Sequence, residues 1–553
     1  MNLLIIALAI LLIFNSEIKQ GADADEEVQG TCNSYAKYRT YDGSCNNLMN
    51  PSWGKAETPQ RRFEYNGHKM VDYDDDVDHP RGGLPSKLPS PRLISNKLMA
   101  EELGPADQSS PTLINLCFPF VVPGDDKELT PGCRGFQRAD KSPDVTAYRE
   151  QINDVTSYID CSHVYGSSDA QLATLRDTTY SFLLKTSPGN NLPESKTGFC
   201  RRKPESTDFC QLTGDSRNDQ VPSLQLNHLV LVREHNRLAK MLKQINPYWD
   251  NDRVFEETRR IVIAEMQHIT YNEYLPAILS PRTMKRYNLR PRKCGFDDCY
   301  SVKINAAVRN AFAAAAFRMG HSQTMREQSL LADDYKTKNT ELLVDNFFMP
   351  HLVQTNQGAN VKDFTRWLTF TPANKIDSYG VNSMRNRLFN RSSDLFSTNI
   401  QRGRDQGVPS YNDWREFCDL KRFTFQDFPK KLQYVLQDLY VSCDDIDLFV
   451  GGLLEKSKNG RVGETFACLI GKQFHLSKYG DRYWYERKEC GFTEAQLNAI
   501  KEMTMSKILC ENFELDRIQK KAFLRPENEG KLRFCDTLPG LNLFLWREKE
   551  WQP

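Results

Sequence analysis

The stretch AAAAFRMGHSQ, residues 313–323, determines how the rest of the chain is interpreted. His321 follows Gly320 at the end of an alanine-rich segment that favours a helix, and Arg318 stands three residues earlier. An imidazole at the end of a packed helix can bind a metal ion while the helix stays buried. Histidines in such positions are more often structural, so the assignment depends on the rest of the chain.

Three other segments carry side chains suited to the same kind of site. They are GDSRNDQVPSLQLNHLVLVREHNRLA (residues 214–239), TNIQRGRDQGVPSYNDWR (residues 398–415) and REQINDVTSYIDCSHVYGSS (residues 149–168). The first places Arg217 just before an amphipathic helix, and the second carries Asn399 and Arg402. The third has alternating oxygen donors.

Together these motifs resemble the animal haem peroxidases, and the resemblance extends from about Cys32 to Trp546. It implies a mainly α-helical domain that holds haem b between its helices. It also implies an oxidoreductase that uses hydrogen peroxide to oxidise small donors such as phenols or halides. The resemblance therefore predicts hydrogen peroxide and small-molecule donors as the partners of this protein.

Composition and charge favour one large secreted domain. Across 553 residues, 73 Lys and Arg balance 72 Asp and Glu, so no basic surface indicates a nucleic acid or an acidic membrane as partner. The apolar run from Leu3 to Phe14 is too short to span a bilayer, and small residues follow it up to Ala24. We therefore expect a signal peptide over residues 1–24 and a secreted, soluble protein without a later membrane span.

Fifteen cysteines fit an oxidising compartment, where disulfides persist. Short spacings predict four pairs: Cys32–Cys45, Cys117–Cys133, Cys200–Cys210 and Cys294–Cys299. The resemblance implies two long-range pairs, Cys418–Cys468 and Cys510–Cys535. Because the count is odd, at least one thiol is unpaired, and the candidates are Cys161, Cys443 and Cys490.

Apolar periodicity predicts a mainly α fold with little strand and long loops tied by disulfides. Residues 25–111 are rich in Pro, Gly and acidic side chains, which predicts an irregular N-terminal arm with a solvated acidic run at 72–78. By the resemblance, the peroxidase domain also starts within this range. A helical haem peroxidase domain is expected over residues 112–553. Its expected helices cover residues 224–242, 254–269, 304–319, 431–439 and 493–509.

The resemblance assigns the iron-binding side of the haem to His321 and Asn399. His321 would ligate the iron, and the side-chain oxygen of Asn399 would accept a hydrogen bond from its other ring nitrogen. Arg318 and Arg402 would pair with the haem propionates. From the residues alone, Asn399 is equally well a turn residue next to GRDQG, and the two arginines could form ordinary ion pairs.

On the opposite, distal side the resemblance assigns Arg217 to stabilise charge on the peroxide O–O bond as it breaks. The alternative is that Arg217 pairs with a carboxylate such as Asp215. REHNRLA contains Glu234 and His235, which look catalytic, but in the family this is a structural helix segment. We therefore expect His235 to be a hydrogen-bonded packing residue.

The alternating oxygens of VTSYIDCS resemble the calcium loop of the family. Thr156, Tyr158, Asp160 and Ser162 would contribute side-chain or carbonyl oxygens, of which Ca²⁺ takes six to eight. The alternative is a turn rich in Ser and Thr. In the family an aspartate beside the distal histidine completes this site, so here the calcium site is expected to be incomplete.

The segment that carries the distal histidine in the family has no counterpart in this chain. ADQSSPT (residues 106–112) runs directly into LINLCFPFVVPGDD (residues 113–126), and no consecutive His–Asp pair replaces the missing segment. His68, His79 and His163 do not stand in a matching context. Loss of such an acid–base group typically lowers a rate about 10²- to 10⁴-fold.

Gln220 stands where the family has a glutamate that esterifies haem, and Val221 follows it. We therefore expect haem b without an ester link. Three hypotheses follow: an active peroxidase whose written sequence lacks an exon, a catalytically impaired haem-binding pseudoperoxidase that acts as an extracellular binding or structural protein, and a secreted scaffold without haem. Extracellular matrix or coat proteins would be partners under the second.

Overall fold

The structure is a computed structural model that describes residues 32–65, 68–69, 88–99, 120–140, 142 and 150–548. The expected signal peptide, the acidic run at 72–78 and the junction between Ser110 and Cys117 lie outside the described residues.

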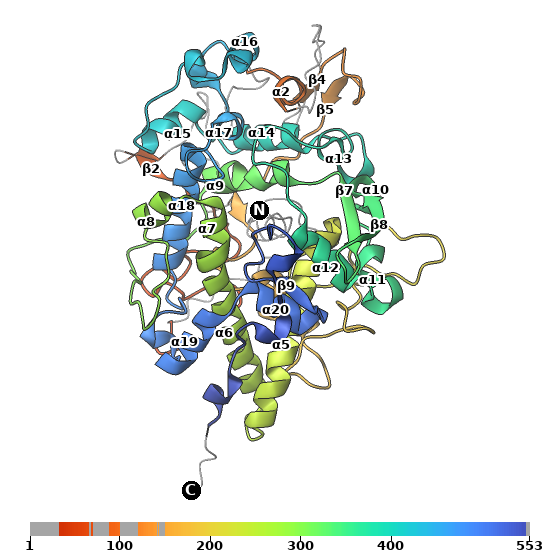
Figure 1. Ribbon diagram of the computed structural model, residues 1–553. Coiled ribbons are helices and arrows are strands. Elements are labelled where there is room, and N and C mark those ends of the chain that lie inside the picture. Colours follow the sequence, from red (N-terminus) through yellow and green to blue (C-terminus); the bar gives the residue numbers. More distant parts are fainter. Residues whose placement is uncertain are drawn as a thin grey trace.

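Two long helices pack side by side near the middle of the chain (Figure 1). They are α5 (Pro222–Ile245) and α6 (Asn251–Ile269), and they confirm the helices expected at 224–242 and 254–269. Proline at the first position of α5 costs no hydrogen bond there, and the Asp250 side chain caps α6 by accepting from the backbone of Arg253. The apolar faces of both helices belong to one large core.

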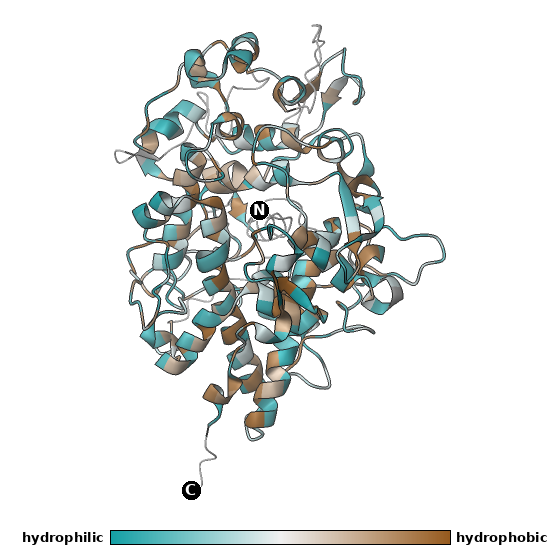
Figure 2. Cartoon of the chain, viewed as in Figure 1, coloured by the Kyte–Doolittle hydropathy of each residue, from teal (hydrophilic) through white to brown (hydrophobic). Residues whose placement is uncertain are grey.

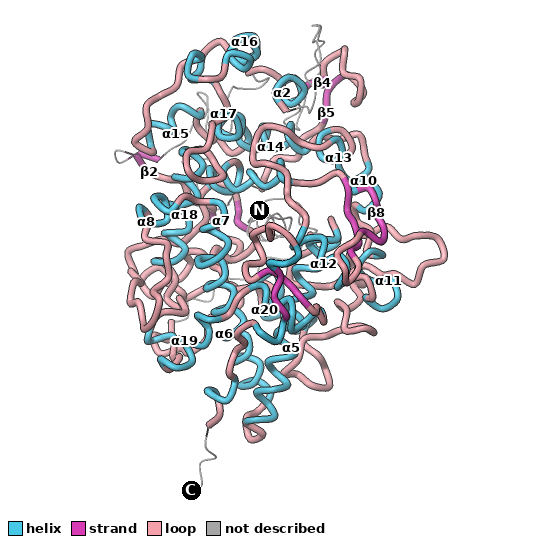
Figure 3. The backbone as a smooth tube through the Cα atoms, in the orientation of Figure 1, coloured by secondary structure: helices cyan, strands magenta, loops and turns pink. Residues whose placement is uncertain are grey.

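The remaining helices surround this pair and confirm the mainly α fold (Figure 3). On the N-terminal side of the chain they are α2 (Pro91–Leu98), α3 (Ser162–Tyr165), α4 (Asp169–Leu175), η1 (Asn218–Gln220), η2 (Thr270–Tyr274), α7 (Leu275–Ile278), α8 (Pro281–Arg286), α9 (Asn310–Ala314) and η3 (Ala316–Gln323). After these come α10 (Leu343–Asn346), α11 (His351–Gly358), α12 (Val361–Phe370), α13 (Asn382–Arg385), η4 (Leu388–Asn390), α14 (Leu395–Asp405), α15 (Tyr411–Phe417), η5 (Phe425–Asp427), α16 (Lys430–Leu439), η6 (Cys443–Asp445) and α17 (Leu448–Leu454). The last group is α18 (Glu464–Tyr479), η7 (Lys488–Cys490), α19 (Glu494–Glu502), α20 (Met505–Phe513), η8 (Glu529–Lys531), η9 (Cys535–Thr537) and η10 (Leu543–Trp546).

Strands are short, and in the described part of the chain they form only two-stranded antiparallel pairs. The pairs are β1 (Thr58–Pro59) with β6 (Ile152–Asn153), β2 (Glu64–Tyr65) with β3 (His68–Lys69), β4 (Phe120–Val122) with β5 (Gly132–Arg134), β7 (Glu327–Leu331) with β8 (Thr337–Leu342), and β9 (Arg517–Gln519) with β10 (Leu532–Phe534). The scarcity of strand that the sequence predicts is confirmed.

Two expected helices differ from the structure. The helix expected at 304–319 begins only at Asn310, because the preceding backbone pairs with Arg61 of the arm: Arg61 donates to the carbonyl of Val308 and accepts from the N–H of Asn310, both at 2.9 Å. The helix expected at 493–509 is two helices, α19 and α20. They separate where the Thr504 side chain caps α20 by accepting from the backbone of Lys507.

Four disulfides join described residues. They are Cys32–Cys45, Cys200–Cys210, Cys418–Cys468 and Cys510–Cys535, which confirms two of the short-range and both long-range pairs. Cys117 lies outside the described residues, so its expected pair with Cys133 is not described. The pair Cys294–Cys299 is wrong, because Cys294 is exposed whereas Cys299 is half-buried and both remain thiols. Cys161, Cys443 and Cys490 are buried thiols, as expected.

Arg92 fastens the N-terminal part of the chain to α14. It is 1% exposed, and its guanidinium donates to Asp126 at 2.6 Å and to Asp394 at 2.7 Å. Asp394 is the N-cap of α14, where it accepts from the backbone of Phe396 and Ser397. The position of α14 therefore depends on a buried ion pair as well as on apolar packing.

Hydrophobic and hydrophilic residues are interspersed along most helices (Figure 2). Within the described ranges, none of the helices is long and apolar enough to cross a membrane.

Candidate haem site

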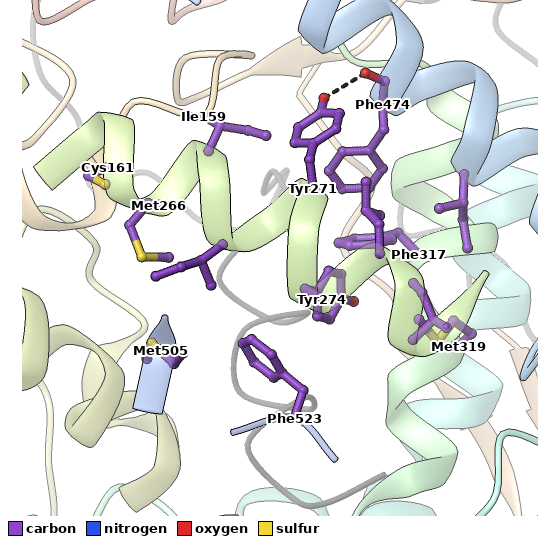
Figure 4. Packing of buried hydrophobic residues seen from close by; sticks show 14 of the residues in the cluster. Ile159, Cys161, Met266, Tyr271, Tyr274, Phe317, Met319, Phe474, Met505 and Phe523 are labelled. Atoms are coloured by element: carbon purple, nitrogen blue, oxygen red, sulfur yellow. Dashed lines mark hydrogen bonds between the residues drawn. The ribbon is translucent and has the colours of Figure 1, made fainter. Parts of the chain in front are cut away.

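Aromatic packing fixes the segment that carries His321. This segment is η3, a 3₁₀ helix that follows α9. Phe317 of η3 stacks on Phe312 of α9, with ring centroids 4.5 Å apart, and meets Phe474 of α18 edge-on at 5.5 Å. Figure 4 shows Phe317 close to Tyr274 and Phe474, and Tyr271 donates to the Phe474 carbonyl. These aromatic contacts hold η3, and with it His321, in place.

His321 and Asn399 meet across the core although they lie 78 residues apart in sequence. Nδ1 of His321 is 2.8 Å from Nδ2 of Asn399, a residue of α14 that is 0% exposed. The structure therefore brings together the two residues that the sequence predicts to be partners. Among the described residues, none forms a hydrogen bond to the outer ring nitrogen of His321, Nε2.

Arg318 sets the orientation of the Asn399 amide. Its Nη1 donates to Oδ1 of Asn399 at 2.8 Å, and its Nε donates to the Ala313 carbonyl at 2.9 Å. With the amide oxygen engaged in this way, the amide nitrogen faces His321. This differs from the sequence expectation, in which the amide oxygen accepts from Nδ1–H of His321. The physical reason is that Arg318 can only donate and therefore turns the amide oxygen of Asn399 toward itself, which leaves the amide nitrogen on the side of His321.

Burial keeps the His321 imidazole neutral. Burial is the main cause that lowers the pKa of His321 to about 3, and the neighbouring Arg318 cation lowers it further. A neutral imidazole is the form that binds a metal ion. Arg318, His321 and Asn399 therefore form a buried group whose only charge is the Arg318 guanidinium.

Arg402 lies on the same helix as Asn399 but has a partner of its own. Its Nη1 donates to Asp405 at 2.9 Å, and its guanidinium lies 4.4 Å from the ring centroid of Phe136. Arg138 also donates to Asp405, at 2.6 Å. Arg402 is therefore held between a carboxylate and an aromatic ring.

Arg217 pairs with Asp215, which is the alternative that the sequence left open. The guanidinium Nε lies 2.9 Å from Oδ1 of Asp215, and the backbone N–H of Arg217 donates to the same oxygen at 2.9 Å. Although burial alone would raise the pKa of Asp215, the Arg217 cation lowers it below its usual range. The ion pair holds the GDSR turn in shape.

His163 lies against this turn, which its sequence context did not indicate. A Cβ atom added at Gly214 would come within 2.3 Å of the carbonyl oxygen of Ser162, so the two backbones are in close contact. The His163 ring meets the ring of His228 edge-on, 5.3 Å away. Burial, and then His228, lower the pKa of His163 to about 3, so it is neutral.

Three of the four expected calcium-loop side chains gather at one point. Oγ1 of Thr156 lies 2.6 Å from Oδ2 of Asp160 and 3.5 Å from Oγ of Ser162. The Tyr158 hydroxyl points elsewhere and donates to the carbonyl of Trp53. Only the backbone of Tyr158 therefore remains available to this group.

His235 is the packing residue that the sequence predicts. Its Nδ1 lies 3.1 Å from the Tyr165 hydroxyl, and its Nε2 lies 3.2 Å from the Phe182 carbonyl.

Asp219 is a buried carboxyl that sequence reasoning did not single out. It accepts from the Gln211 backbone at 2.8 Å and from the Gln225 side chain at 3.2 Å, yet burial raises its pKa to about 7. It lies close to Cys200 and Cys210, but those sulfurs form a disulfide and cannot serve as metal ligands. The neighbouring Gln220 is half-buried, and its carbonyl accepts from Phe348.

The architecture defines a class of protein: a mainly helical domain in which a buried histidine contacts a buried asparagine. The sequence profile described as Animal haem peroxidase matches residues 38–116 and 104–523. The chain therefore belongs to the animal haem peroxidase family. The two matches meet near the junction where the sequence indicates a missing segment.

Among its relatives, Chorion peroxidase of Drosophila melanogaster is 34% identical over 92% of this chain and 71% of its own length. Peroxidasin homolog of Homo sapiens is 33% identical over 93% of this chain but only 39% of its own length. Thyroid peroxidase of Rattus norvegicus is 31% identical, with 63% of that protein covered. The chain thus spans 71% of the length of Chorion peroxidase, 63% of that of thyroid peroxidase and 39% of that of the peroxidasin.

Solved structures agree on the fold. Peroxidase A from Dictyostelium discoideum superposes with a TM-score of 0.71 at 26% identity, covering 90% of this chain and 99% of that one. The fatty acid alpha-dioxygenase of Oryza sativa also superposes with a TM-score of 0.71, over 89% of this chain and 88% of that one. Its identity is 15%, so it speaks for the fold alone.

Proposed function

We propose that this protein binds haem b through Nε2 of His321 and uses hydrogen peroxide to oxidise small donors such as phenols or halides. The observation that carries the proposal is the buried contact of 2.8 Å between His321 and Asn399. The packing residue His235 has partners at both ring nitrogens, whereas His321 has a partner at Nδ1 and none at Nε2 among the described residues. Nε2 is therefore the atom at which a ligand would complete the site. When bound, haem would supply the redox chemistry.

The residues present fit such a group. His321 is neutral, and its Nε2 has no hydrogen-bond partner among the described residues. In the observed arrangement Nδ1 accepts from Asn399, so Nε2 carries the proton and becomes a ligand once that proton stands on Nδ1 instead. Arg318 and Arg402 provide planar cations suited to propionates. If Arg318 turns toward a propionate, the Asn399 amide can rotate by 180° and offer its oxygen to Nδ1–H of His321, which makes the imidazole a stronger ligand.

On the distal side, we propose that Arg217 stabilises negative charge on the peroxide. For this the guanidinium must keep at least one N–H free of Asp215. We propose further that the protein is secreted, which its four described disulfides favour, and that Thr156, Asp160, Ser162 and the Tyr158 carbonyl form part of a calcium site.

A second candidate function is that of a haem-binding pseudoperoxidase with little turnover, acting as an extracellular binding or structural protein. Arg217 can stabilise charge but cannot move a proton between the two peroxide oxygens, and it is already paired with Asp215. Gln220 cannot esterify haem. These residues favour the second candidate for the chain as written.

Steady-state oxidation of guaiacol by the haem-loaded protein separates the two candidates. A rate within tenfold of a relative that has the distal histidine would support an active peroxidase. A rate lower by about 10²- to 10⁴-fold, the contribution of a general acid–base group, would support the pseudoperoxidase. No bound haem at all would exclude both.

A further inference from the structure

A cavity of about 570 Å³ lies outside the candidate haem site. Its wall is formed by β2 and the residues before it, by α8 and α18, by the end of α15 and by the loop that precedes α9. In Figure 1 the labels β2, α8 and α18 lie along one side of the molecule. Pockets for small ligands typically have volumes of about 300–1,000 Å³, so the cavity has room for one.

The cavity wall is strongly cationic. It contains one acidic side chain, Glu64, and five basic ones: Arg62, Arg286, Lys303, Arg309 and Lys472. Glu150 and Asp419 partly neutralise two of these, since Arg62 lies 3.2 Å from Glu150 and Arg286 lies 2.9 Å from Asp419. The other three form no ion pair with a described carboxylate.

Aromatic rings rather than carboxylates hold two of these cations in place. Nζ of Lys472 lies 4.3 Å from the ring centroid of Phe417, and the Arg309 guanidinium lies 5.8 Å from that of Phe63. The rings of Phe63 and Phe417 are themselves in contact, 5.2 Å apart. Such cation–π contacts position a charge without cancelling it.

Besides the Phe63 ring, backbone carbonyls hold the Arg309 guanidinium. It donates to the carbonyls of Ala307 and Asn305, while its buried Nε has no hydrogen-bond partner. These neutral carbonyls hold the guanidinium without an ion pair, so its charge remains available to an anion in the cavity.

The pKa shifts of Arg309 and Lys472 agree with a cavity wall whose positive charge is not fully neutralised. Burial, followed by the neighbouring Arg61, lowers the pKa of Arg309 to about 10. Burial also lowers the pKa of Lys472, where Asp419 opposes the shift and Arg286 adds to it. An anion in the cavity would relieve the repulsion between these cations.

We propose that this cavity binds a small aromatic anion, whose carboxylate, sulfonate or phosphate group contacts Lys472, Lys303 and Arg309 while its ring lies along the apolar part of the wall. The site is separate from the candidate haem site and shares no residue with it. Phe474, on the same helix as Lys472, packs on Phe317 of the His321 segment, so α18 lies between the two.

Isothermal titration calorimetry with 8-anilinonaphthalene-1-sulfonate tests the proposal on the full chain, with equimolar haemin added to occupy the haem site. We expect one molecule bound per chain. The double variant Lys303→Gln/Lys472→Gln should bind it about tenfold more weakly. The control Lys240→Gln/Lys431→Gln removes the same charge from exposed positions outside the cavity and should bind as the wild type does.

Two further measurements test whether the anionic group and the cavity lysines are needed for binding. N-phenyl-1-naphthylamine, which lacks the sulfonate, should bind at least tenfold more weakly than the sulfonate, and competition by benzoate or phenyl phosphate shows which anionic group is preferred. Because Lys303 is exposed, the single variant Lys303→Gln tests the idea even if the double variant fails to fold. Equal affinity across all variants, or equal binding of the neutral compound, would overturn the proposal.

Discussion

The two sides of the candidate haem site are built in different ways. On the iron-binding side, Arg318, His321 and Asn399 contact one another directly across two segments of the core. On the distal side, Arg217 is paired with a residue only two positions away, and the family's histidine has no counterpart. The contacts among Arg318, His321 and Asn399 depend on tertiary structure. The GDSR turn around Arg217, by contrast, is held by a contact between near neighbours in sequence. We therefore propose that haem binding and peroxide chemistry are separable in this chain.

Restoring the missing segment has the largest expected effect. Inserting the corresponding segment of a relative between Ser110 and Cys117 should raise the rate of guaiacol oxidation about 10²- to 10⁴-fold, because it supplies the proton-transferring group. The measurement is steady-state turnover of haem-loaded protein. The same insertion with its histidine replaced by alanine is the control, and an equal gain in that control would refute the role given to proton transfer.

Arg92→Met should lower the free energy of unfolding by about 3–5 kcal/mol, because it leaves Asp394 buried without its charged partner. The N-terminal segment and α14, which carries Asn399, would then lose this ion pair and keep the hydrogen bond from Arg404 to the Pro89 carbonyl. Urea denaturation measures the change. Lys458→Met breaks an exposed pair of 2.8 Å with Glu464 and should cost less than about 1 kcal/mol. Equal losses in the two variants would show that burial of the ion pair is unimportant.

Asn399→Leu should accelerate loss of haem to apomyoglobin about 10- to 100-fold, the usual effect of removing the hydrogen-bond partner of a metal-bound histidine. Asn399→Asp offers a carboxylate oxygen to Nδ1–H of His321, the role proposed for the rotated amide, and should restore most of the retention. If leucine and aspartate behave alike, Asn399 contributes only packing.

The smallest expected effect concerns Asp219 and depends on pH. An unfolded aspartate ionises near pH 4, whereas in the folded protein burial raises the pKa of Asp219 to about 7. The wild type therefore loses stability as pH rises between these values. Asp219→Asn cannot ionise, so it should be about 1–3 kcal/mol more stable than the wild type at pH 8, after allowance for one weakened hydrogen bond, and no more stable at pH 4. Thermal unfolding at the two pH values would show this, and a difference independent of pH would contradict it.

Much of the fold followed from the sequence because the longest helices are strongly amphipathic. The periodicity that predicts α5 and α6 reflects their burial against one core. The alanine-rich segment misled for a physical reason: alanine has a high helix propensity, but the backbone pairing with Arg61 keeps residues 304–309 out of the helix. Such a contact joins positions far apart in sequence and leaves no periodic signal.

The proximity of His321 and Asn399 was predictable from the sequence, but the hydrogen bonds around them were not. The motifs identified His321 and Asn399, which the structure places in contact. They could not show that Arg318 takes the Asn399 oxygen, because that choice depends on side-chain geometry. The closeness of His163 to the GDSR turn likewise depends on backbone packing at Gly214.

The central claim is that His321 holds haem iron, and titration of the apoprotein with haemin tests it most directly. We expect a Soret band that saturates at one haem per chain in the wild type and in His351→Ala, which removes a buried histidine paired with Glu341 elsewhere in the fold. His321→Ala should show no such band. A folded wild-type protein that leaves the haemin spectrum unchanged, or a His321→Ala variant that binds haemin as tightly as the wild type, would contradict the claim.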